Sequence, residues 1–399
     1  MRLYVAAGFG AAAALSVVLL AGCGSAPQVP GVASAPGAAA LPRDPISLLR
    51  AQASGELAGP IPRERLREQL EAIASKPRPR FASHSSAKIG MWLANTSYGY
   101  LLGATANAKA VVTSVNVESN GCYYPITVKV DHAGNVWTAC EYDAAFTGGS
   151  VQEYTSAGVQ AGAYDESAPQ CSPSATCTFS GYGFDEANDA TNVFDTLATF
   201  SLSVCTKKCT VTSGSGFEYW PAGSPSATPT LIALPYANPV KEVYYMDLDQ
   251  AGNIWFDYYG CISATCGYGL AEITNPTTAS WSFVPILPPG TIGFAGGIYV
   301  SGGGATLNVT DQLARTIAQY ALPLSPSGTP LDTLGPTKQN LFGCGDPVSG
   351  GFNKAERMQA DGDPCGWVDI GKVTANKWRA AGGINYSGIE GAAYTPSDR

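Results

Sequence analysis

The amino-acid sequence predicts an all-β fold, a β-propeller of six four-stranded blades preceded by a flexible tether and a short helical segment. Two observations carry this prediction. The heptapeptide DHAGNVW ends at Trp137 and recurs as DQAGNIW, which ends at Trp255, 118 positions later. In addition, only 14 % of the residues are charged, whereas Gly (46), Pro (28) and Tyr (20) are abundant. Such a composition is typical of short strands joined by many turns.

Residues 1–22 have the pattern of a signal peptide. Arg2 precedes an apolar, alanine-rich stretch at 5–20 that is shorter than a usual membrane span. The stretch ends in Leu-Ala-Gly-Cys at 20–23, which resembles the lipobox of bacterial lipoproteins. The resemblance implies that Cys23 is acylated and anchors the mature chain in the membrane. The residue after the cysteine is Gly24, whereas lipoproteins retained at the inner membrane carry an aspartate there. This difference favours an anchor in the outer membrane, with the protein facing the periplasm or the surface. An ordinary secretory signal is the alternative.

Residues 23–42 and 43–80 are expected to connect the anchor to the folded domain. The first segment consists mainly of Ala, Pro, Gly and Ser and has too little apolar surface to order itself, which predicts a flexible tether. In the second, Leu66, Leu70 and Ile73 follow Pro62 at helical spacing and favour a short helix. This helix either lies on the main domain, or is left partly loose, or binds a partner.

From residue 81 to residue 399 the pattern is strand, turn, strand, and this range is predicted to be the propeller domain. Asp-x-x-Gly-Asn predicts a tight hairpin turn, because Gly and Asn tolerate positive φ. A decayed copy, NDATNVF, ends at Phe194 and divides the 118 positions into 57 and 61. Weaker copies give reference positions at Trp92, Leu307 and Trp367. Six blades of about 53 residues fit this range, and five or seven are the alternatives.

These segments resemble the NHL-repeat and streptogramin-lyase-like six-bladed propellers, whose blades carry Asp-x-x-Gly-Asn-[Val/Ile]-Trp and a third strand with Glu-Tyr. VDHAGNVW, LDQAGNIW and VQEYTSAG are the matching segments. The resemblance concerns the scaffold, and a scaffold does not define an activity. Streptogramin lyases depend on histidines and a glutamate about the central channel, with magnesium. The two histidines of this chain, His84 and His132, do not reproduce that constellation.

Cysteine usage agrees with export. Besides Cys23 the chain has ten cysteines, which lie as near neighbours in the sequence. Short separations favour disulfides between neighbours, although many connectivities are possible. A zinc or redox site would need C-x-x-C pairs or histidine partners, and the chain has no C-x-x-C. The suggested pairs are Cys122 with Cys140, Cys171 with Cys177, Cys205 with Cys209, Cys261 with Cys266, and Cys344 with Cys365.

Several function classes find no support. A net charge of −8 and a pI near 4.9 argue against nucleic-acid binding. The chain has no G-x-S-x-G elbow, H-E-x-x-H motif, Walker loop or dinucleotide fingerprint. His132 lies inside a hairpin turn, at the edge opposite the face where propeller ligands usually enter, and His84 has no recognisable partner. The tryptophans of the heptapeptides are predicted to pack between adjacent blades and not to stack on a ligand.

The remaining candidates for a functional site are carboxylate and amide side chains. Propellers of the gluconolactonase type bind a divalent ion, such as Ca²⁺ or Mg²⁺, through Glu, Asn and Asp at the channel mouth. The reference positions are expected on the second strand of each blade, which ends at the ligand face, and a polar residue follows the reference position in five of the six expected blades. These residues either cap turns, which is the plainer interpretation, or converge on a cation or polar ligand. They are Asn95, Glu141, Asp195, Asp257 and Asp369. The tyrosine-rich segment 256–269 is a candidate contact surface for carbohydrate or peptide, or else packing.

The sequence therefore favours a lipid-anchored, exported propeller that acts as a binding or interaction module at the bacterial envelope, with an envelope protein or a carbohydrate as its partner. The alternative is a divalent-metal-dependent lyase, lactonase or hydrolase that uses carboxylates at the channel mouth. A structural envelope component is a third possibility. No catalytic signature decides between them.

Overall fold

The computed structural model describes residues 87–334 with short gaps at 97, 108–109, 144–147, 168–173, 207, 235–239, 263–264, 302–303, 315 and 327. It also describes the backbone at 346–352, 358–363, 367–372, 377–380 and 389–395. The expected signal peptide, tether, helical segment and domain start at residue 81 lie outside the described residues. Within the described ranges, no helix is long and apolar enough to cross a membrane. The helical element found there is a single 3₁₀ turn, η1 (Glu118–Asn120).

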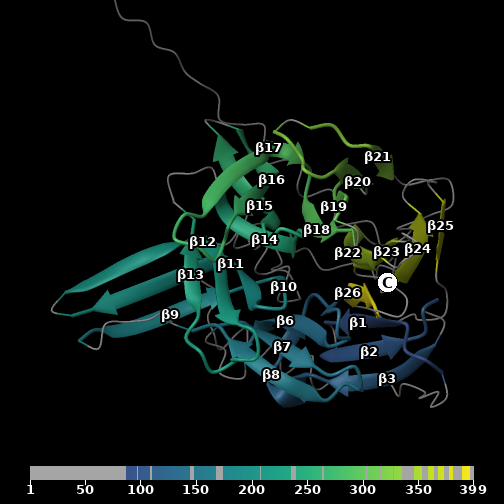
Figure 1. Ribbon diagram of the computed structural model, residues 1–399, viewed down its shortest axis with the longest axis horizontal. Coiled ribbons are helices and arrows are strands. Elements are labelled where there is room, and N and C mark those ends of the chain that lie inside the picture. The colour runs from purple at the N-terminus through teal and green to yellow at the C-terminus, as the bar shows by residue number, and fades with distance from the viewer. Residues whose placement is uncertain are drawn as a thin grey trace, which may run out of the picture. The chain divides into compact units, whose positions relative to one another are not determined.

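The described strands form six antiparallel sheets, here named A to F in chain order (Figure 1). Sheet A joins the last strand of the chain to the first three, in the order β26 (Ile389–Tyr394), β1 (Met91–Asn95), β2 (Tyr100–Ala104) and β3 (Val111–Asn116). In sheet B, β4 (Tyr123–Pro125) and β5 (Lys129–Val130) both pair with β6 (Val136–Tyr142), followed by β7 (Ser150–Tyr154) and β8 (Gln160–Asp165).

Sheet C has the order β10 (Glu186–Asn188), β11 (Asn192–Cys205), β12 (Cys209–Pro221) and β13 (Thr230–Ala233), and β9 (Thr176–Tyr182) also pairs with β11. Sheet D consists of β14 (Val240–Leu248), β15 (Ile254–Ile262), β16 (Thr265–Thr274) and β17 (Ser282–Ile292). Sheet E consists of β18 (Ala295–Val300), β19 (Thr306–Asp311), β20 (Thr316–Ala321) and β21 (Asp332–Leu334). Sheet F consists of β22 (Asp346–Phe352), β23 (Met358–Asp363), β24 (Trp367–Lys372) and β25 (Lys377–Ala380).

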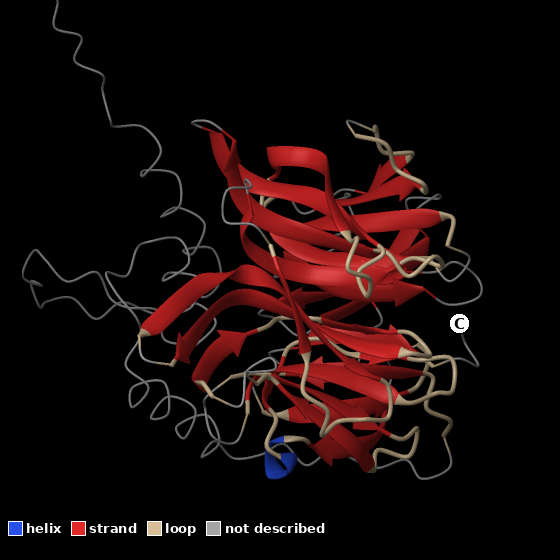
Figure 2. Cartoon of the chain, turned by 60° about the vertical axis from the view of Figure 1, so that its left-hand side comes forward, coloured by secondary structure: helices blue, strands red, loops and turns tan. Residues whose placement is uncertain are grey.

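The sheets follow one another around a closed circuit, which is the arrangement of a β-propeller. Contacts join β5 to β26, β6 to β10, β10 to β14, β14 to β18, β18 to β22, and β22 back to β26. Strands account for most of the described chain (Figure 2). Five sheets are built from consecutive strands, whereas sheet A is completed by β26 from the other end of the chain. The predicted all-β propeller class is therefore confirmed.

The prediction of six uniformly four-stranded blades needs correction, because sheets B and C each contain five strands. In sheet B the innermost strand is broken into β4 and β5. The break follows Tyr124, which has a positive φ of 58°, and Pro125, which has no backbone N–H to donate. In sheet C the strand β11 is long enough to pair with β9 as well as with β10 and β12.

The heptapeptide turns fold as predicted. Asp131 lies between β5 and β6, and its carboxylate accepts hydrogen bonds from the Asn135 N–H (2.8 Å) and the Trp137 indole Nε1–H (3.1 Å). Asp249, between β14 and β15, bonds Asn253 and Trp255 in the same way. Gly134 and Gly252 adopt φ values of 91° and 78°, a region in which a side chain is strained.

The weaker copies of the turn agree with the structure in all but one case. Asp189 caps the turn before Phe194 by accepting from the Thr191 and Asn192 N–H groups (2.6 and 2.7 Å). Leu307 lies on β19, the second strand of sheet E. Trp367, however, lies on β24, the third strand of sheet F, so its assignment as a second-strand reference position is wrong.

The hydrophobic core is a series of layers between neighbouring sheets. Trp137 of sheet B packs with Val193 and Trp220 of sheet C, and Trp255 of sheet D packs with Ile298 and Leu307 of sheet E. Both heptapeptide tryptophans are buried, with 4 % and 1 % of their surface exposed. Their predicted position between blades is confirmed. His132 is exposed in its turn, and His84 lies outside the described residues.

Sheet C extends beyond the ring. The outer part of the β11–β12 hairpin, from residue 199 to residue 214, pairs on one side with β9 and ends at the Cys205–Cys209 disulfide. In Figure 1 these strands project away from the other sheets. We call β9 together with residues 199–205 and 209–214 the sheet extension. The suggested disulfides Cys122–Cys140 and Cys261–Cys266 also form, and Cys177 is disulfide-bonded too. Cys171, Cys344 and Cys365 lie outside the described residues.

Candidate functional site

The sequence-predicted polar residues do not share one environment. Asn95 accepts a hydrogen bond from the Tyr98 N–H (3.0 Å) and so caps the turn that follows β1. Asp257 on β15 accepts from the Tyr245 N–H (2.8 Å), where β14 is irregular. Both residues are fully buried. The Asn95 contact matches the plainer interpretation, turn capping, whereas Asp257 lies within a strand and bonds the neighbouring strand.

Asp369 is a further correction. It lies on β24, the third strand of sheet F, and pairs with Ala360 of β23, so it does not end a second strand as predicted. Glu141 and Asp195 do lie on second strands, β6 and β11, and both are buried. Strand alternation puts Glu141 on the same side of β6 as Trp137, which contacts sheet C.

The structure groups Asp195 with three carboxyl residues that sequence reasoning did not select. Glu186, Asp195 and Glu218 are paired across β10, β11 and β12 and therefore form one row on one face of sheet C. Glu166, immediately after β8 of sheet B, lies close enough to this row for its charge to raise the pKa of Asp195, after the larger effect of burial. We call these four residues the carboxyl cluster. Their exposed fractions are between 0 % and 6 %.

Glycines leave room for the cluster. A Cβ atom on Gly149 would lie 2.4 Å from Oε1 of Glu166, and one on Gly183 would lie 2.6 Å from Oδ1 of Asp195. Either contact is closer than side chains tolerate, and at Gly183 a Cβ atom would also lie 2.0 Å from the Thr196 backbone oxygen, so neither position accommodates a larger residue. From β6 of sheet B, the Ala139 N–H donates a hydrogen bond to Oε2 of Glu186 (3.0 Å).

Burial raises the pKa values of all four carboxyl groups. It raises the pKa of Glu166 to about 8. It also raises the pKa of Glu186 to about 8, with a further increase from Asp185 and an opposing effect of Lys129. The pKa values of Asp195 and Glu218 lie well above the usual range because of burial and then because of the Glu166 carboxylate. Burial and mutual repulsion therefore favour the protonated forms of these groups.

A second network lies beside the cluster and joins the innermost strands. The Lys129 ammonium group on β5 pairs with Oδ1 of Asp185 (2.9 Å) and donates to the backbone oxygens of Met246 (2.6 Å) and Glu186. Oδ2 of Asp185 accepts from the Met246 N–H (2.9 Å). Lys129 thus reaches from sheet B past sheet C to sheet D.

The charge state of Lys129 is maintained by its neighbours. Burial alone would lower the pKa of Lys129, but the carboxylates of Asp185, Asp247 and Glu186 outweigh burial and raise it above the usual value. In turn, Lys129 opposes the rise in the pKa of Asp185 that burial causes. The lysine is a charged group held inside the protein by acidic partners.

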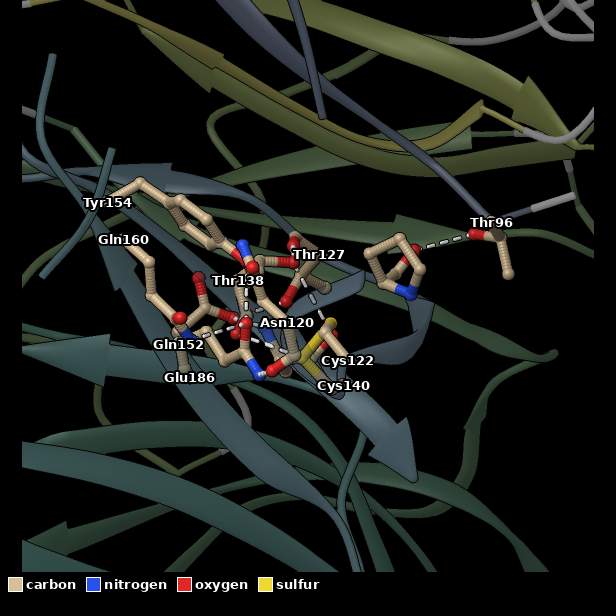
Figure 3. Close-up of a disulfide and its surroundings, with 12 residues drawn as sticks. Thr96, Asn120, Cys122, Thr127, Thr138, Cys140, Gln152, Tyr154, Gln160 and Glu186 are labelled. Carbon is tan, nitrogen blue, oxygen red and sulfur yellow. Dashed lines mark hydrogen bonds between the residues drawn. A yellow bond between two sulfur atoms is a disulfide. The ribbon is translucent and has the colours of Figure 1, made fainter. Parts of the chain in front are cut away.

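Hydroxyl groups link the two networks to the first disulfide. The Thr127 hydroxyl donates to Glu186, and the Thr138 hydroxyl donates to the Thr127 backbone oxygen (2.6 Å). Figure 3 shows these threonines next to the Cys122–Cys140 bridge. The disulfide and the threonines lie on β6 or next to β4 and β5 of sheet B, beside Glu186.

This arrangement offers buried proton-binding groups and no exposed nucleophile. Among the described residues, no three histidine, cysteine or acidic side chains are grouped so that they could hold a metal ion. The predicted Ca²⁺ or Mg²⁺ site at the channel mouth stays a prediction. In the tyrosine-rich segment, Tyr258 is fully buried and Tyr268 packs against Tyr244, Tyr259 and Phe294. The described aromatic groups of this segment therefore contribute to packing.

Comparison with known proteins supports the fold alone. No protein-family model matches the chain, and no curated protein matches it. Among solved structures, a crystal structure of the nidogen/laminin complex is similar, with a TM-score of 0.51 and 10 % identity over 77 % of this chain and 98 % of that chain. Regucalcin, a calcium-binding protein from Agrobacterium tumefaciens strain C58, aligns with a TM-score of 0.41 and 13 % identity over 65 % of this chain and 74 % of that chain.

A streptogramin B lyase aligns with a TM-score of 0.36 and 13 % identity over 64 % of this chain and 67 % of that chain. At these identities a likeness in fold carries neither substrate nor activity. The circuit of sheets and the similarity to the nidogen/laminin structure together establish the architecture: the chain folds as a β-propeller.

Proposed function

We propose that the protein is a lipid-anchored, exported β-propeller that binds a protein partner at the bacterial envelope through the sheet extension. The observation that carries the proposal is the open edge of β12. The strand pairs with β13 at residues 216–219, whereas, among the residues that the structure describes, residues 209–214 pair with β11 on one side only. A sheet edge of this kind accepts an additional strand from another chain.

The backbone geometry defines which groups are offered to the partner. The Ser215 C=O accepts a hydrogen bond from the Leu234 N–H (3.0 Å) on the side of β13. Since peptide groups alternate along a strand, those of Ser213 and Val211 point to that same side, beyond the end of β13. The extension therefore presents main-chain donors and acceptors to a partner segment in extended conformation.

The side chains of this edge suit a neutral or acidic partner segment. Thr210, Thr212 and Ser213 are exposed, and Val211 exposes 62 % of its surface. Lys208, in the loop between residues 205 and 209 at the tip of the extension, is the charged residue described there, whereas the whole chain has a net charge of −8. Edges that avoid partners usually carry charged side chains or proline. The absence of such protection along residues 209–214 favours an edge that binds.

Site-specific photo-crosslinking in the source bacterium tests the binding surface. A photoreactive phenylalanine analogue at Val211 is expected to give one discrete crosslinked protein, because this side chain lies on the open edge. The same analogue at Val159, which is 63 % exposed but lies between β7 and β8, is the matched control and is expected to give none. Equal products from both positions, or no protein product from Val211, would contradict a protein partner at this edge. The second result would instead favour a carbohydrate.

Membrane anchoring is tested separately. Because the acyl chains on Cys23 are the proposed anchor, Cys23→Ser is expected to move the protein from the membrane fraction to the soluble fraction. Fractionation followed by immunodetection measures this shift, and Cys209→Ser, in the extension, is the control that keeps the anchor. Unchanged fractionation of Cys23→Ser would show that the protein is retained by other means.

A further inference from the structure

The carboxyl cluster lies at the junction of two sheets and not within one. Glu166 belongs to the end of sheet B, whereas Glu186, Asp195 and Glu218 belong to sheet C. Described residues of the two sheets are joined here by side-chain contacts, among them the Trp137, Val193 and Trp220 layer. The state of the four carboxyl groups therefore acts on the contact between the sheets.

The carboxyl oxygens are buried with few donors. Both oxygens of Glu166 and both oxygens of Glu218 are inaccessible to solvent. The backbone N–H groups of Gly149 and Gly183 lie near Glu166 and that of Ser167 lies near Glu218, but within the described part of the chain none of them completes a hydrogen bond to these oxygens. One oxygen each of Glu186 and Asp195 is likewise inaccessible to solvent and without a completed hydrogen bond to a described residue. A buried carboxylate without donors is costly, whereas a protonated carboxyl group can itself donate to its neighbour. Proton occupancy thus decides whether this junction is attractive or repulsive.

The surrounding charges do not neutralise the cluster. The Lys129 ammonium group pairs with Asp185 and is directed towards Met246 of sheet D. Asp143 raises the pKa of Glu166 further, after the larger effect of burial. Tyr164 and Glu153 lie farther along the same face of sheet B. Besides these two residues and the cluster, the titratable groups on or next to the strands that meet at this junction are Lys129, Glu141, Asp143, Asp165 and Asp185.

We propose that the junction between sheets B and C is a proton-operated joint, that is, a contact between two sheets that opens or closes according to whether the carboxyl cluster is protonated. When the carboxyl cluster is protonated, hydrogen bonds between its members hold the two sheets together. When the cluster ionises, like charges in a buried site repel one another and loosen this junction, while the other junctions of the propeller stay closed. The glycines at 149 and 183 keep the space that the carboxyl groups need in the closed state.

The sign of the effect follows from the pKa values. Glu166 and Glu186 have pKa values of about 8 in the closed junction, compared with an ordinary value of 4.5 in water. The stabilisation from their protons is fully present below pH 4.5 and is lost as the pH rises to about 8. Within this window, a group that is protonated in the closed junction and ionised in the open one makes the equilibrium depend on pH. Each such group shifts the equilibrium between the closed and the open junction about tenfold towards the open one for every unit by which the pH rises.

Hydrogen exchange of the full chain at pH 5.5, 7.0 and 8.5, detected by mass spectrometry, tests the joint. The measured exchange rates are corrected for the intrinsic rates at each pH. Peptides covering 148–167, 183–197 and 214–220 are expected to lose protection at least tenfold between pH 5.5 and pH 8.5. Peptides from β15 and β16 of sheet D are expected to keep theirs. This comparison uses the unmodified protein, so it does not depend on whether any variant folds.

Paired variants identify the groups responsible. Glu166→Gln combined with Glu218→Gln replaces two acids by neutral side chains of the same shape and is expected to make protection at 148–167 independent of pH. Glu272→Gln is the matched control, because this half-buried carboxyl group on β16 also has a pKa raised by burial. The control is expected to behave as the wild type.

Three results would overturn the proposal. Protection that does not change with pH would show that the cluster does not titrate in this range. An equal loss in all sheets would show a global effect with no local joint. Protection at pH 8.5 that 1 mM Ca²⁺ or Mg²⁺ restores as fully as acid does would show that a cation, and not protons, holds the junction.

Discussion

Lys129→Met is expected to destabilise the folded chain by about 3–5 kcal/mol at pH 7, the usual cost of removing one partner of a buried ion pair. The methionine fills a similar volume but leaves Asp185 buried without the ammonium group that lies 2.9 Å from it. It also removes the hydrogen bond to the Met246 backbone oxygen. The midpoint of urea unfolding, monitored by tryptophan fluorescence, measures the loss.

The pH dependence of this loss identifies its cause. Burial already raises the pKa of Asp185, and Lys129 opposes that rise. Without the lysine, Asp185 binds a proton more readily, so the penalty is expected to shrink between pH 7 and pH 5. Lys208→Met, at the exposed tip of the sheet extension, is the control and is expected to leave the midpoint unchanged. A pH-independent penalty would show that lost packing, and not an uncompensated charge, is responsible.

Asp249→Ala is expected to cost about 2–4 kcal/mol, because several donors lose one acceptor at once. The carboxylate accepts from the Ala251 N–H (2.8 Å), the Asn253 N–H and side chain (both 3.0 Å) and the Trp255 Nε1–H (3.1 Å). Trp255 is 1 % exposed, so water cannot replace the lost partner of its indole. Urea unfolding again gives the measurement.

The equivalent turn supplies the comparison for this prediction. Asp131 accepts from the Asn135 N–H and the Trp137 indole, so Asp131→Ala is expected to destabilise the chain in the same direction but by less. His132→Ala, an exposed position in that turn, is expected to have no effect. Equal midpoints for Asp249→Ala and His132→Ala would mean that the carboxylate is dispensable.

The hairpin turns and the disulfides were predictable because their causes are local. In both heptapeptides the Asp carboxylate, the glycine with positive φ and the tryptophan lie within seven residues of one another. Cys205–Cys209 and Cys261–Cys266 close separations of 4 and 5 residues. Composition and spacing are sufficient for such features, because few alternative structures satisfy the same short segment.

The misplaced Trp367 and Asp369 show where local patterns fail. A tryptophan between sheets does not identify the second strand, since Trp220 on β12 occupies the same layer as Trp137 on β6. Without the Asp-x-x-Gly-Asn turn, the sequence around Trp367 does not distinguish a second from a third strand. Strand order in sheet F depends on pairing across the sheet, which the tertiary structure determines.

The carboxyl cluster was not predictable for a related reason. Asp195 and Glu218 meet because β11 and β12 pair in one particular register, and a shift by one residue would turn either side chain to the opposite face. Glu166 joins them only because sheet B packs against sheet C. The extension of sheet C likewise depends on β9 finding β11 beyond the ring.

The sequence alone determined the all-β class, the repeated Asp-capped turns, the tryptophan layers and the neighbouring disulfides, because short-range hydrogen bonding and steric limits act within each segment. Only the tertiary structure decided which carboxyl groups are buried together, which of the described strands extend beyond the ring and how Lys129 links three sheets. Those outcomes depend on register and on packing between residues far apart in the chain, where desolvation sets the charge state of each group.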